Sequence, residues 1–326
     1  MAISMTKTLK NLFAIEKKPL KGLVLMEWAM VVYALFTLVL MLFFYTRLQN
    51  PVSMIIVRFQ SILMVIALWA VYRMLPCKMT LLIRIMCQLA LLAIWYPDTF
   101  EFNRIMPNLD HYFATCEQQL FGCQPALLFH QKFPSAFLSE LLTMGYVSYY
   151  PMMFVMVFYF YSYHFDQLLK ASFVMVSSFF LFYVIFIFLP VAGPQYYYLA
   201  VGLDQIALGH FPDIGNYFET HTEVLPAPGW TEGMFYKLLT IAHDAGERPT
   251  AAFPSSHVGV MVVFLWQALL IKAKKLFWTL MLFTVLTFFA TFYLQAHYVI
   301  DAIAGIFAGT VIFFLLTGIY ALIEKR

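Results

Sequence analysis

Eight long apolar segments constrain the fold of this chain more than any other feature. A helix needs about 20 apolar residues to cross the roughly 30 Å hydrocarbon core of a bilayer. Segments of about that length cover residues 23–45, 53–72, 80–96, 142–163, 171–190, 254–271, 277–295 and 299–323. Charged residues make up only 11% of the chain, against about 25% in soluble domains. The sequence therefore predicts an all-α, polytopic membrane helix bundle with about eight transmembrane helices.

Lysine and arginine are unevenly distributed among the segments that connect these spans. If both ends of the chain are cytoplasmic, the inner segments contain thirteen basic residues and the outer loops contain five. Positively charged loops resist translocation, so this bias favours cytoplasmic termini. Arg58 and Arg84 fall inside predicted spans, where we expect them to snorkel or to pair. We expect an integral protein of the plasma (inner) membrane.

Two outer loops, residues 97–135 and 191–253, are too long to be simple connectors. Loops of this length are usually functional or disordered, and their aromatic content argues against disorder. We expect the first loop to form short interfacial helices, interrupted at Pro107 and Pro125. The same loop contains Cys116 and Cys123, which an oxidising compartment would allow to pair and which otherwise remain free thiols.

The predicted organisation has three parts. Residues 1–22 form a cytoplasmic N-terminal segment, residues 23–78 contribute two additional transmembrane helices, and residues 79–323 form a six-helix core that includes both outer loops. No repeat or soluble domain boundary is visible in the sequence.

Two of the eight histidines stand at the outer ends of predicted spans. In "FPSSH", Ser255 and Ser256 precede His257 at the start of the sixth span. Serine hydroxyls cap exposed backbone N–H groups, and a helix start of this kind suits a phosphate. An ordinary N-cap with an incidental histidine is the alternative interpretation.

The second motif, "HYVID", places His297 and Asp301 four residues apart. Residues at this spacing share one helix face, so the Asp301 carboxylate can accept a hydrogen bond from the His297 imidazole and determine which ring nitrogen is free. A structural His–Asp pair is the alternative. A carboxylate at the rim of a membrane span has an energetic cost, which favours a functional role.

Two imidazoles and one carboxylate suit phosphoryl transfer on the outer face of the membrane. One histidine can attack phosphorus while the other protonates the leaving oxygen, a chemistry that requires no metal and no other cofactor. Arg248 is a candidate for binding the phosphate charge, and Lys237 is a weaker one. Glu140, Tyr146 and Tyr149 are expected to line the approach to the site.

The two motifs together resemble the second and third motifs of the type 2 phosphatidic acid phosphatase superfamily. That pattern is PSGH, followed by SR, five residues, H, three residues and D, and here "PSSH" and "HYVID" place their histidines 40 residues apart. The resemblance covers roughly residues 100–320. It implies a six-helix core, with His297 as the nucleophile, Asp301 as its partner and His257 as the general acid.

Two positions depart from that pattern. Thr291 stands where the superfamily has the arginine of its third motif, and Ile241 stands where the lysine of the first motif would precede Arg248. Another donor must therefore bind the phosphate. The threonine, together with "LDHYF" and "LFGCQP", is similar to the branch that contains fungal inositol phosphorylceramide synthase.

The resemblance implies a metal-independent phosphotransferase that moves a phosphate or phospho-headgroup between membrane lipids through a phosphohistidine. If water resolves that intermediate, the protein is a lipid phosphate phosphatase. A non-catalytic lipid transporter is the third alternative, although no inverted repeat is detectable. We expect no nucleic-acid partner, and the head group, the acceptor and the oligomeric state stay open.

Overall fold

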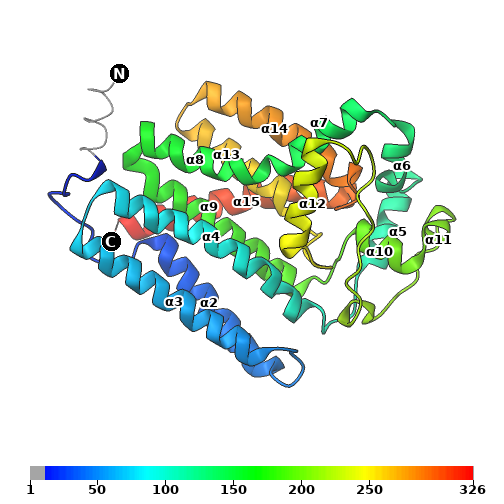
Figure 1. Ribbon diagram of the computed structural model, residues 1–326, viewed down its shortest axis with the longest axis horizontal. Helices are drawn as coiled ribbons and strands as arrows, with labels where there is room; N and C mark the ends of the chain where they lie inside the picture. Colours follow the sequence, from blue (N-terminus) through cyan, green and yellow to red (C-terminus); the bar gives the residue numbers. More distant parts are fainter. Residues whose placement is uncertain (1–11, 326) are drawn as a thin grey trace.

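The computed structural model describes residues 12–325, and every regular element in this range is helical (Figure 1). The α-helices are α2 (Leu25–Phe44), α3 (Pro51–Met74), α4 (Lys78–Asn103), α5 (Asp110–Phe121), α6 (Pro125–Lys132), α7 (Ala136–Val147), α8 (Tyr149–Tyr163), α9 (Leu168–Phe188), α10 (Pro194–Val201), α11 (Leu203–Ala207), α12 (Met234–Gly246), α13 (Ser256–Leu270), α14 (Lys274–Tyr293) and α15 (Val299–Glu324). Two short 3₁₀ helices, η1 (Phe165–Gln167) and η2 (Tyr217–Glu219), complete the set. The predicted membrane helix bundle is confirmed.

All eight predicted spans coincide with helices, but two of them are not single long helices. Six helices in residues 12–325 are long and apolar enough to cross a membrane, and α7 with α8 would be a seventh across a 48° bend. The bend follows from Pro151, which has no N–H to donate to the preceding turn. Helix α13 has 15 residues and rises only about 22 Å, so it is short for a span.

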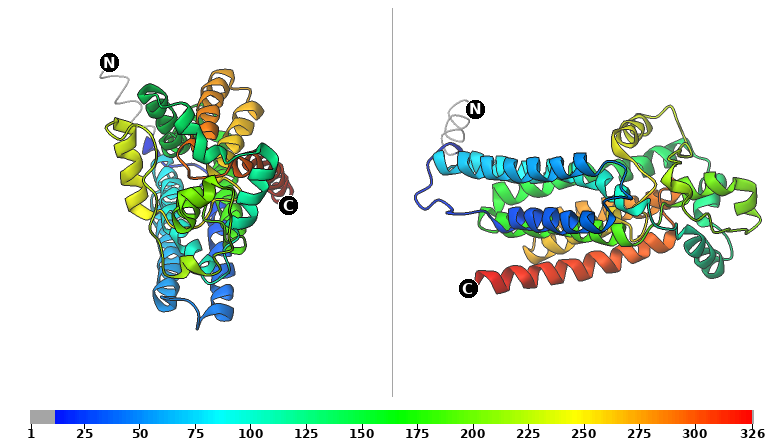
Figure 2. Two further views of the ribbon diagram at one scale, coloured as in Figure 1. Left: turned by 90° about the vertical axis from the view of Figure 1, so that its right-hand side faces the viewer. Right: turned by 90° about the horizontal axis from the view of Figure 1, so that it is seen from below.

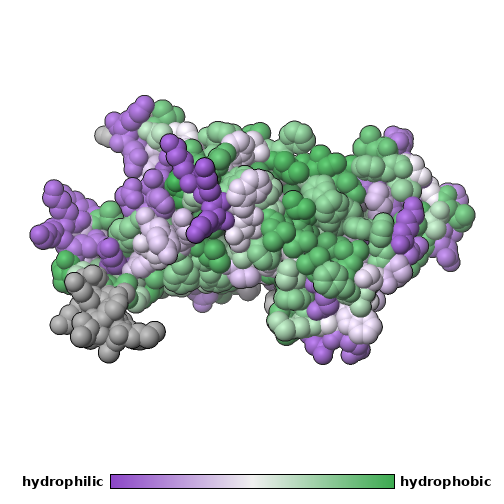
Figure 3. All heavy atoms as spheres, turned by 90° about the horizontal axis from the view of Figure 1, so that it is seen from above, coloured by the Kyte–Doolittle hydropathy of each residue, from purple (hydrophilic) through white to green (hydrophobic). Residues whose placement is uncertain are grey.

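The long helices run side by side, and the loops gather at one end of the bundle. Figure 2 shows the first described residues and the C-terminal end of α15 together at one end, with α5, α6, α10 and α11 at the other. We call this other end the loop end. Hydrophobic side chains cover the middle of the face in Figure 3, and hydrophilic ones gather toward the two ends. Residues 1–11 of the predicted N-terminal segment lie outside the described residues.

The first outer loop contains the short helices α5 and α6, interrupted near Pro107 and Pro125 as expected. Cys116 and Cys123 are free thiols, so the disulfide is not formed.

The two intramembrane arginines each pair with a carboxylate. Arg58 lies 2.6 Å from Asp98, and Arg84 lies 2.5 Å from Glu27, with both guanidinium groups buried. An isolated charge would be costly at this depth, so each pair joins two helices of the bundle, α3 to α4 and α4 to α2.

Helices α13 and α15 approach each other closely because glycines face each other where they cross. A Cβ atom on Gly309 would lie 2.2 Å from the Gly259 carbonyl oxygen, and one on Gly305 would lie 2.5 Å from the Ser255 carbonyl oxygen. Small residues permit this approach between membrane helices. The crossing brings together the N-terminal ends of α13 and α15, which contain the two sequence motifs.

We predict that Gly309→Ala lowers the melting temperature of the detergent-solubilised protein, because the added methyl group meets backbone atoms of α13. Overpacking of this kind costs about 1–3 kcal/mol. Gly318 is the matched control, since a Cβ at that position on the same helix has no atom within 4 Å. Alanine is the better helix former, so Gly318→Ala should be neutral or slightly stabilising. Equal melting temperatures for the two variants would contradict the packing argument.

Candidate active site

The "FPSSH" motif forms the start of α13. The helix begins at Ser256, and Ser255 is its N-cap, with a side-chain oxygen that accepts from the Val258 N–H. The predicted capping role of this serine is confirmed, whereas Pro254 precedes the helix. The Ser255 N–H donates to the Asp301 carbonyl oxygen at 3.0 Å, which joins the first turns of α13 and α15.

His297 lies in the short connection between α14 and α15 and is only 3% exposed. Its Nδ1 lies 2.7 Å from the Ala252 carbonyl oxygen, and its Nε2 lies 3.2 Å from the Ser255 hydroxyl. A carbonyl can only accept, so Nδ1 carries the proton and donates it. The lone pair of Nε2 is therefore available, and the Ser255 hydroxyl donates to it.

Asp301 does not form the expected hydrogen bond with His297. Its Oδ2 lies 3.8 Å from the His297 Nδ1 and instead accepts the Tyr298 N–H at 2.8 Å, as a capping carboxylate of α15. The Ala252 carbonyl thus orients the imidazole, and the Asp301 side chain lies beside the ring without a hydrogen bond to it. The spacing of four residues could not reveal this, because the competing acceptor is a backbone carbonyl 45 positions away.

His257 faces His297 with 5.7 Å between the ring centroids. Tyr146 stacks on His257 at 4.4 Å, and Tyr149 contacts it at 4.6 Å. Both ring nitrogens of His257 are buried and have no hydrogen-bond partner among the described residues. Buried polar groups are nearly always satisfied, so these two nitrogens indicate a place for a ligand.

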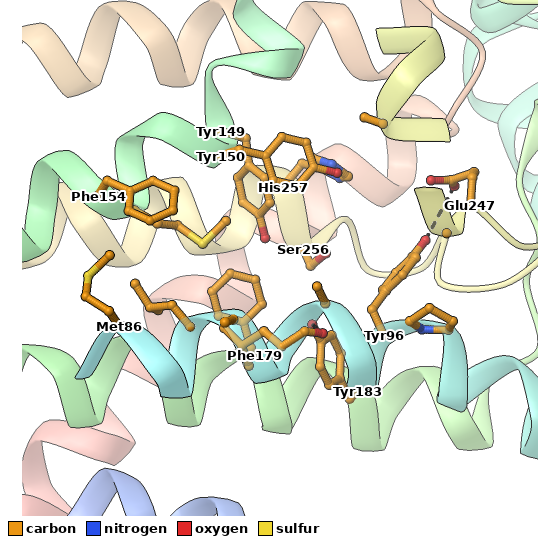
Figure 4. Close-up of a pocket in the computed structure, with 18 residues that line it drawn as sticks. Met86, Tyr96, Tyr149, Tyr150, Phe154, Phe179, Tyr183, Glu247, Ser256 and His257 are labelled. Atoms are coloured by element: carbon orange, nitrogen blue, oxygen red, sulfur yellow. Dashed lines mark hydrogen bonds between the residues drawn. The ribbon is translucent and has the colours of Figure 1, made fainter. Parts of the chain in front are cut away.

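A cavity of about 420 Å³ adjoins His257 (Figure 4). Ser256, His257, Tyr96 and Glu247 contribute polar groups to it. Apolar side chains from α4, α8 and α9 line most of the remainder, including Met86, Leu89, Met153, Phe154 and Phe179. An apolar cavity with a few convergent polar groups is typical of a ligand site, and this one suits part of a lipid.

The predicted phosphate-binding cations are not at this cavity. Arg248 is exposed, and its Nη1 donates to the Glu247 carbonyl oxygen at 2.8 Å. Lys237 is exposed on α12. Thr291 is fully buried, and its hydroxyl donates to the Phe288 carbonyl oxygen at 2.7 Å. Among the described residues that line the cavity there is no lysine and no arginine.

Two buried carboxylates on α5, which we did not single out from the sequence, hold the backbone around His297. Asp110 accepts the N–H groups of Ala192 and Gly193 at 2.7 and 2.8 Å. Glu117 accepts the N–H groups of Val299 and Ile300, at 3.0 and 3.2 Å, and so caps α15. The only signal for them is their spacing of seven residues, which puts both on one helix face.

Glu140 has a similar structural role and does not line the cavity. Its carboxylate accepts the N–H groups of Phe235 and Tyr236, at 3.2 and 3.3 Å, at the start of α12. Tyr149, by contrast, is a cavity residue as expected.

We predict that Glu117→Gln lowers both turnover and melting temperature, because an amide offers only one acceptor oxygen to two backbone donors. Loss of such a buried bond costs about 1–3 kcal/mol. Burial raises the pKa of Glu117 from 4.5 to about 7. The folded protein therefore holds a proton that the unfolded chain releases, and the free energy of unfolding should decrease between pH 4.5 and about 7.

The measurement is thermal unfolding across that pH range for the wild type, Glu117→Gln and the exposed control Glu223→Gln. The contribution of Glu117 should disappear only in Glu117→Gln. If the free energy of unfolding depends on pH equally in the wild type and in Glu117→Gln, the pH dependence does not come from Glu117.

Comparison with known proteins agrees with this geometry. A family model described as the PAP2 superfamily matches residues 111–315, which is well over half of the chain. No curated protein and no solved structure matches the chain. The matched region contains His257, His297 and Asp301, and this superfamily is one of lipid phosphatases and phosphotransferases. With both motif histidines brought together at the loop end of a membrane helix bundle, the chain belongs to the PAP2 superfamily.

Proposed function

We propose that this protein is a lipid phosphotransferase that works through a phosphohistidine on His297. The observation that carries the proposal is the state of the His297 ring. Its Nδ1 proton is held by the Ala252 carbonyl, so the lone pair of Nε2 is available beside a second histidine, His257, with ring centroids 5.7 Å apart.

In the first step, the Nε2 lone pair attacks phosphorus and the bond from phosphorus to the leaving oxygen breaks. His257, in its protonated form, gives a proton to that oxygen. In the second step, neutral His257 takes the proton of the acceptor hydroxyl, which attacks the phosphohistidine and releases His297. The proton and the phosphoryl group are both accounted for, and His257 ends as it began.

Asp301 has an electrostatic role in this scheme. When Nε2 bonds to phosphorus while Nδ1 keeps its proton, the ring becomes positively charged. The Asp301 carboxylate, 3.8 Å from Nδ1, stabilises that charge without holding the ring in place. Ser255 must rotate its hydroxyl away from Nε2 during the attack and can then donate to a phosphate oxygen.

Burial of the site favours a transferase over a phosphatase. A transferase must keep water from the phosphohistidine, and the His297 side chain is almost completely buried. The resemblance to the branch of inositol phosphorylceramide synthase, which rests on Thr291, "LDHYF" and "LFGCQP", also favours a transferase. It suggests a lipid hydroxyl, such as that of ceramide, as the acceptor. Release of inorganic phosphate would instead identify a phosphatase.

The test uses purified protein with mixed phospholipids, with and without ceramide or diacylglycerol, and mass spectrometry of the products. We predict a new phospho-headgroup lipid that is lost in His297→Ala, because that variant lacks the imidazole whose Nε2 lone pair attacks phosphorus. His210→Ala, an exposed histidine of the second loop, is the matched control and should retain activity. Turnover that survives in His297→Ala would exclude the phosphohistidine.

The pH profile offers an independent check. Burial lowers the pKa of His297 from 6.5 to about 4. The attacking form is neutral, so it persists as the pH falls until the pH approaches that value. We predict that the acid limb of kcat/KM assigned to His297 lies well below pH 6.5, measured with a neutral-headgroup lipid. An acid limb at the ordinary histidine value would show that the ring is solvated in the working enzyme.

A further inference from the structure

Glu247 is the one carboxylate among the described residues that line the cavity. It follows the C-terminal end of α12, and Figure 4 shows it near Tyr96, across the cavity from His257. A carboxylate is unexpected in a site that binds phosphate, because the two groups repel each other. Glu247 takes no part in the proposed phosphotransfer steps.

The surroundings of Glu247 leave its charge without a counterion. Its Oε1 accepts only two long hydrogen bonds, from the Tyr96 hydroxyl and the Gln195 side-chain amide, both at 3.4 Å. No ion pair among residues 12–325 includes it, and the neighbouring Arg248 donates to its backbone carbonyl instead. Gln195, which is 2% exposed, also has a buried side-chain oxygen with no partner among the described residues.

The cavity that contains the Glu247 carboxylate is also lined by aromatic rings. Four tyrosines line the same cavity, namely Tyr96, Tyr149, Tyr150 and Tyr183. Aromatic faces attract organic cations, and cages of aromatic rings recognise quaternary ammonium groups such as choline. A carboxylate and tyrosines around one space therefore match an ammonium group, while His257 and His297 match a phosphate.

We propose that the donor is a zwitterionic phospholipid, whose ammonium group binds at Glu247 and the cavity tyrosines while its phosphate lies between His257 and His297. This rests on the proposed function and narrows its substrate class. A zwitterionic phosphodiester brings its own cation to a cavity whose described lining residues include no lysine or arginine. A phosphomonoester such as phosphatidic acid would bring about two negative charges at neutral pH and meet Glu247 without compensation.

Electrostatic coupling between the two ends of this subsite agrees with the proposal. Burial lowers the pKa of His297 to about 4, and the Ala252 carbonyl and then the Glu247 carboxylate act on that pKa in the opposite direction by smaller amounts. A cation bound at Glu247 therefore lies within electrostatic range of the attacking nitrogen, as the headgroup of a phospholipid requires.

The first experiment measures binding in the full-length His297→Ala variant, which has no nucleophile, by titration calorimetry with dihexanoyl lipids. We expect phosphatidylcholine and phosphatidylethanolamine to bind at least tenfold more tightly than phosphatidylglycerol, a phosphodiester without the ammonium group, and phosphatidic acid. Equal affinities for phosphatidylcholine and phosphatidylglycerol would overturn the proposal.

The second experiment repeats these titrations after changing Glu247 in the same background. Glu247→Gln should remove the preference for zwitterionic lipids, and Glu247→Asp should keep part of it. Glu247→Lys should shift the preference toward phosphatidic acid. Glu232→Gln, an exposed glutamate of the same loop, should keep all of it. Unchanged selectivity in folded Glu247→Gln would overturn the proposal, and Glu247→Asp decides the matter if that protein does not fold.

Turnover by the wild type separates this inference from the function on which it rests. A tenfold loss of kcat/KM in Glu247→Gln for zwitterionic donors, but not for phosphatidylglycerol, supports the subsite. An equal loss of kcat in Glu247→Gln for every donor would identify Glu247 as a general base and would overturn the ammonium subsite. Selective binding without any product would contradict the phosphotransferase function and leave the ammonium subsite supported.

Discussion

The close crossing of α13 and α15 is the contact on which the rest of the site depends. Gly259, Gly305 and Gly309 lie where the two backbones meet, and a side chain at these positions would collide with atoms of the other helix or of Phe182 in α9. Membrane helices have little hydrophobic gain from touching each other, so close van der Waals packing must stabilise the contact. The distance between the two histidines follows from it, because each ring lies near the N-terminal end of one of these helices.

Carboxylates organise the loop end of the bundle through backbone N–H groups. Asp110, Glu117 and Glu140 each accept from two consecutive N–H groups, at the starts of α10, α15 and α12 or just before them. Helix starts carry unpaired donors and partial positive charge, so a carboxylate stabilises them. These hydrogen bonds join the loop segments beside the apolar cluster that packs there, and they position the backbone around His297.

The electrostatics of the site differ from what the superfamily pattern implies. The arginine position of the third motif is a buried threonine with its hydroxyl satisfied within its own helix, and Arg248 points to solvent. Positive charge for a bound phosphate must then come from the histidines or from the substrate. His257 and the unpaired Glu247 line one cavity. The same cavity can therefore serve both the attack on phosphorus and the recognition of the donor headgroup.

The sequence by itself determined the helical membrane bundle and the residues of the two motifs, because apolar length and local spacing are properties of neighbouring positions. It also predicted that His257 and His297 lie at the same end of the bundle. Only the tertiary structure decided that Ala252, and not Asp301, accepts the His297 proton, that α5 supplies the buried carboxylates, and that Glu247 enters the cavity while Arg248 does not. These contacts join backbone groups and side chains that are far apart in the chain. They form only when α13 and α15 have crossed at their glycines and the hydrogen bonds of the loop end are in place.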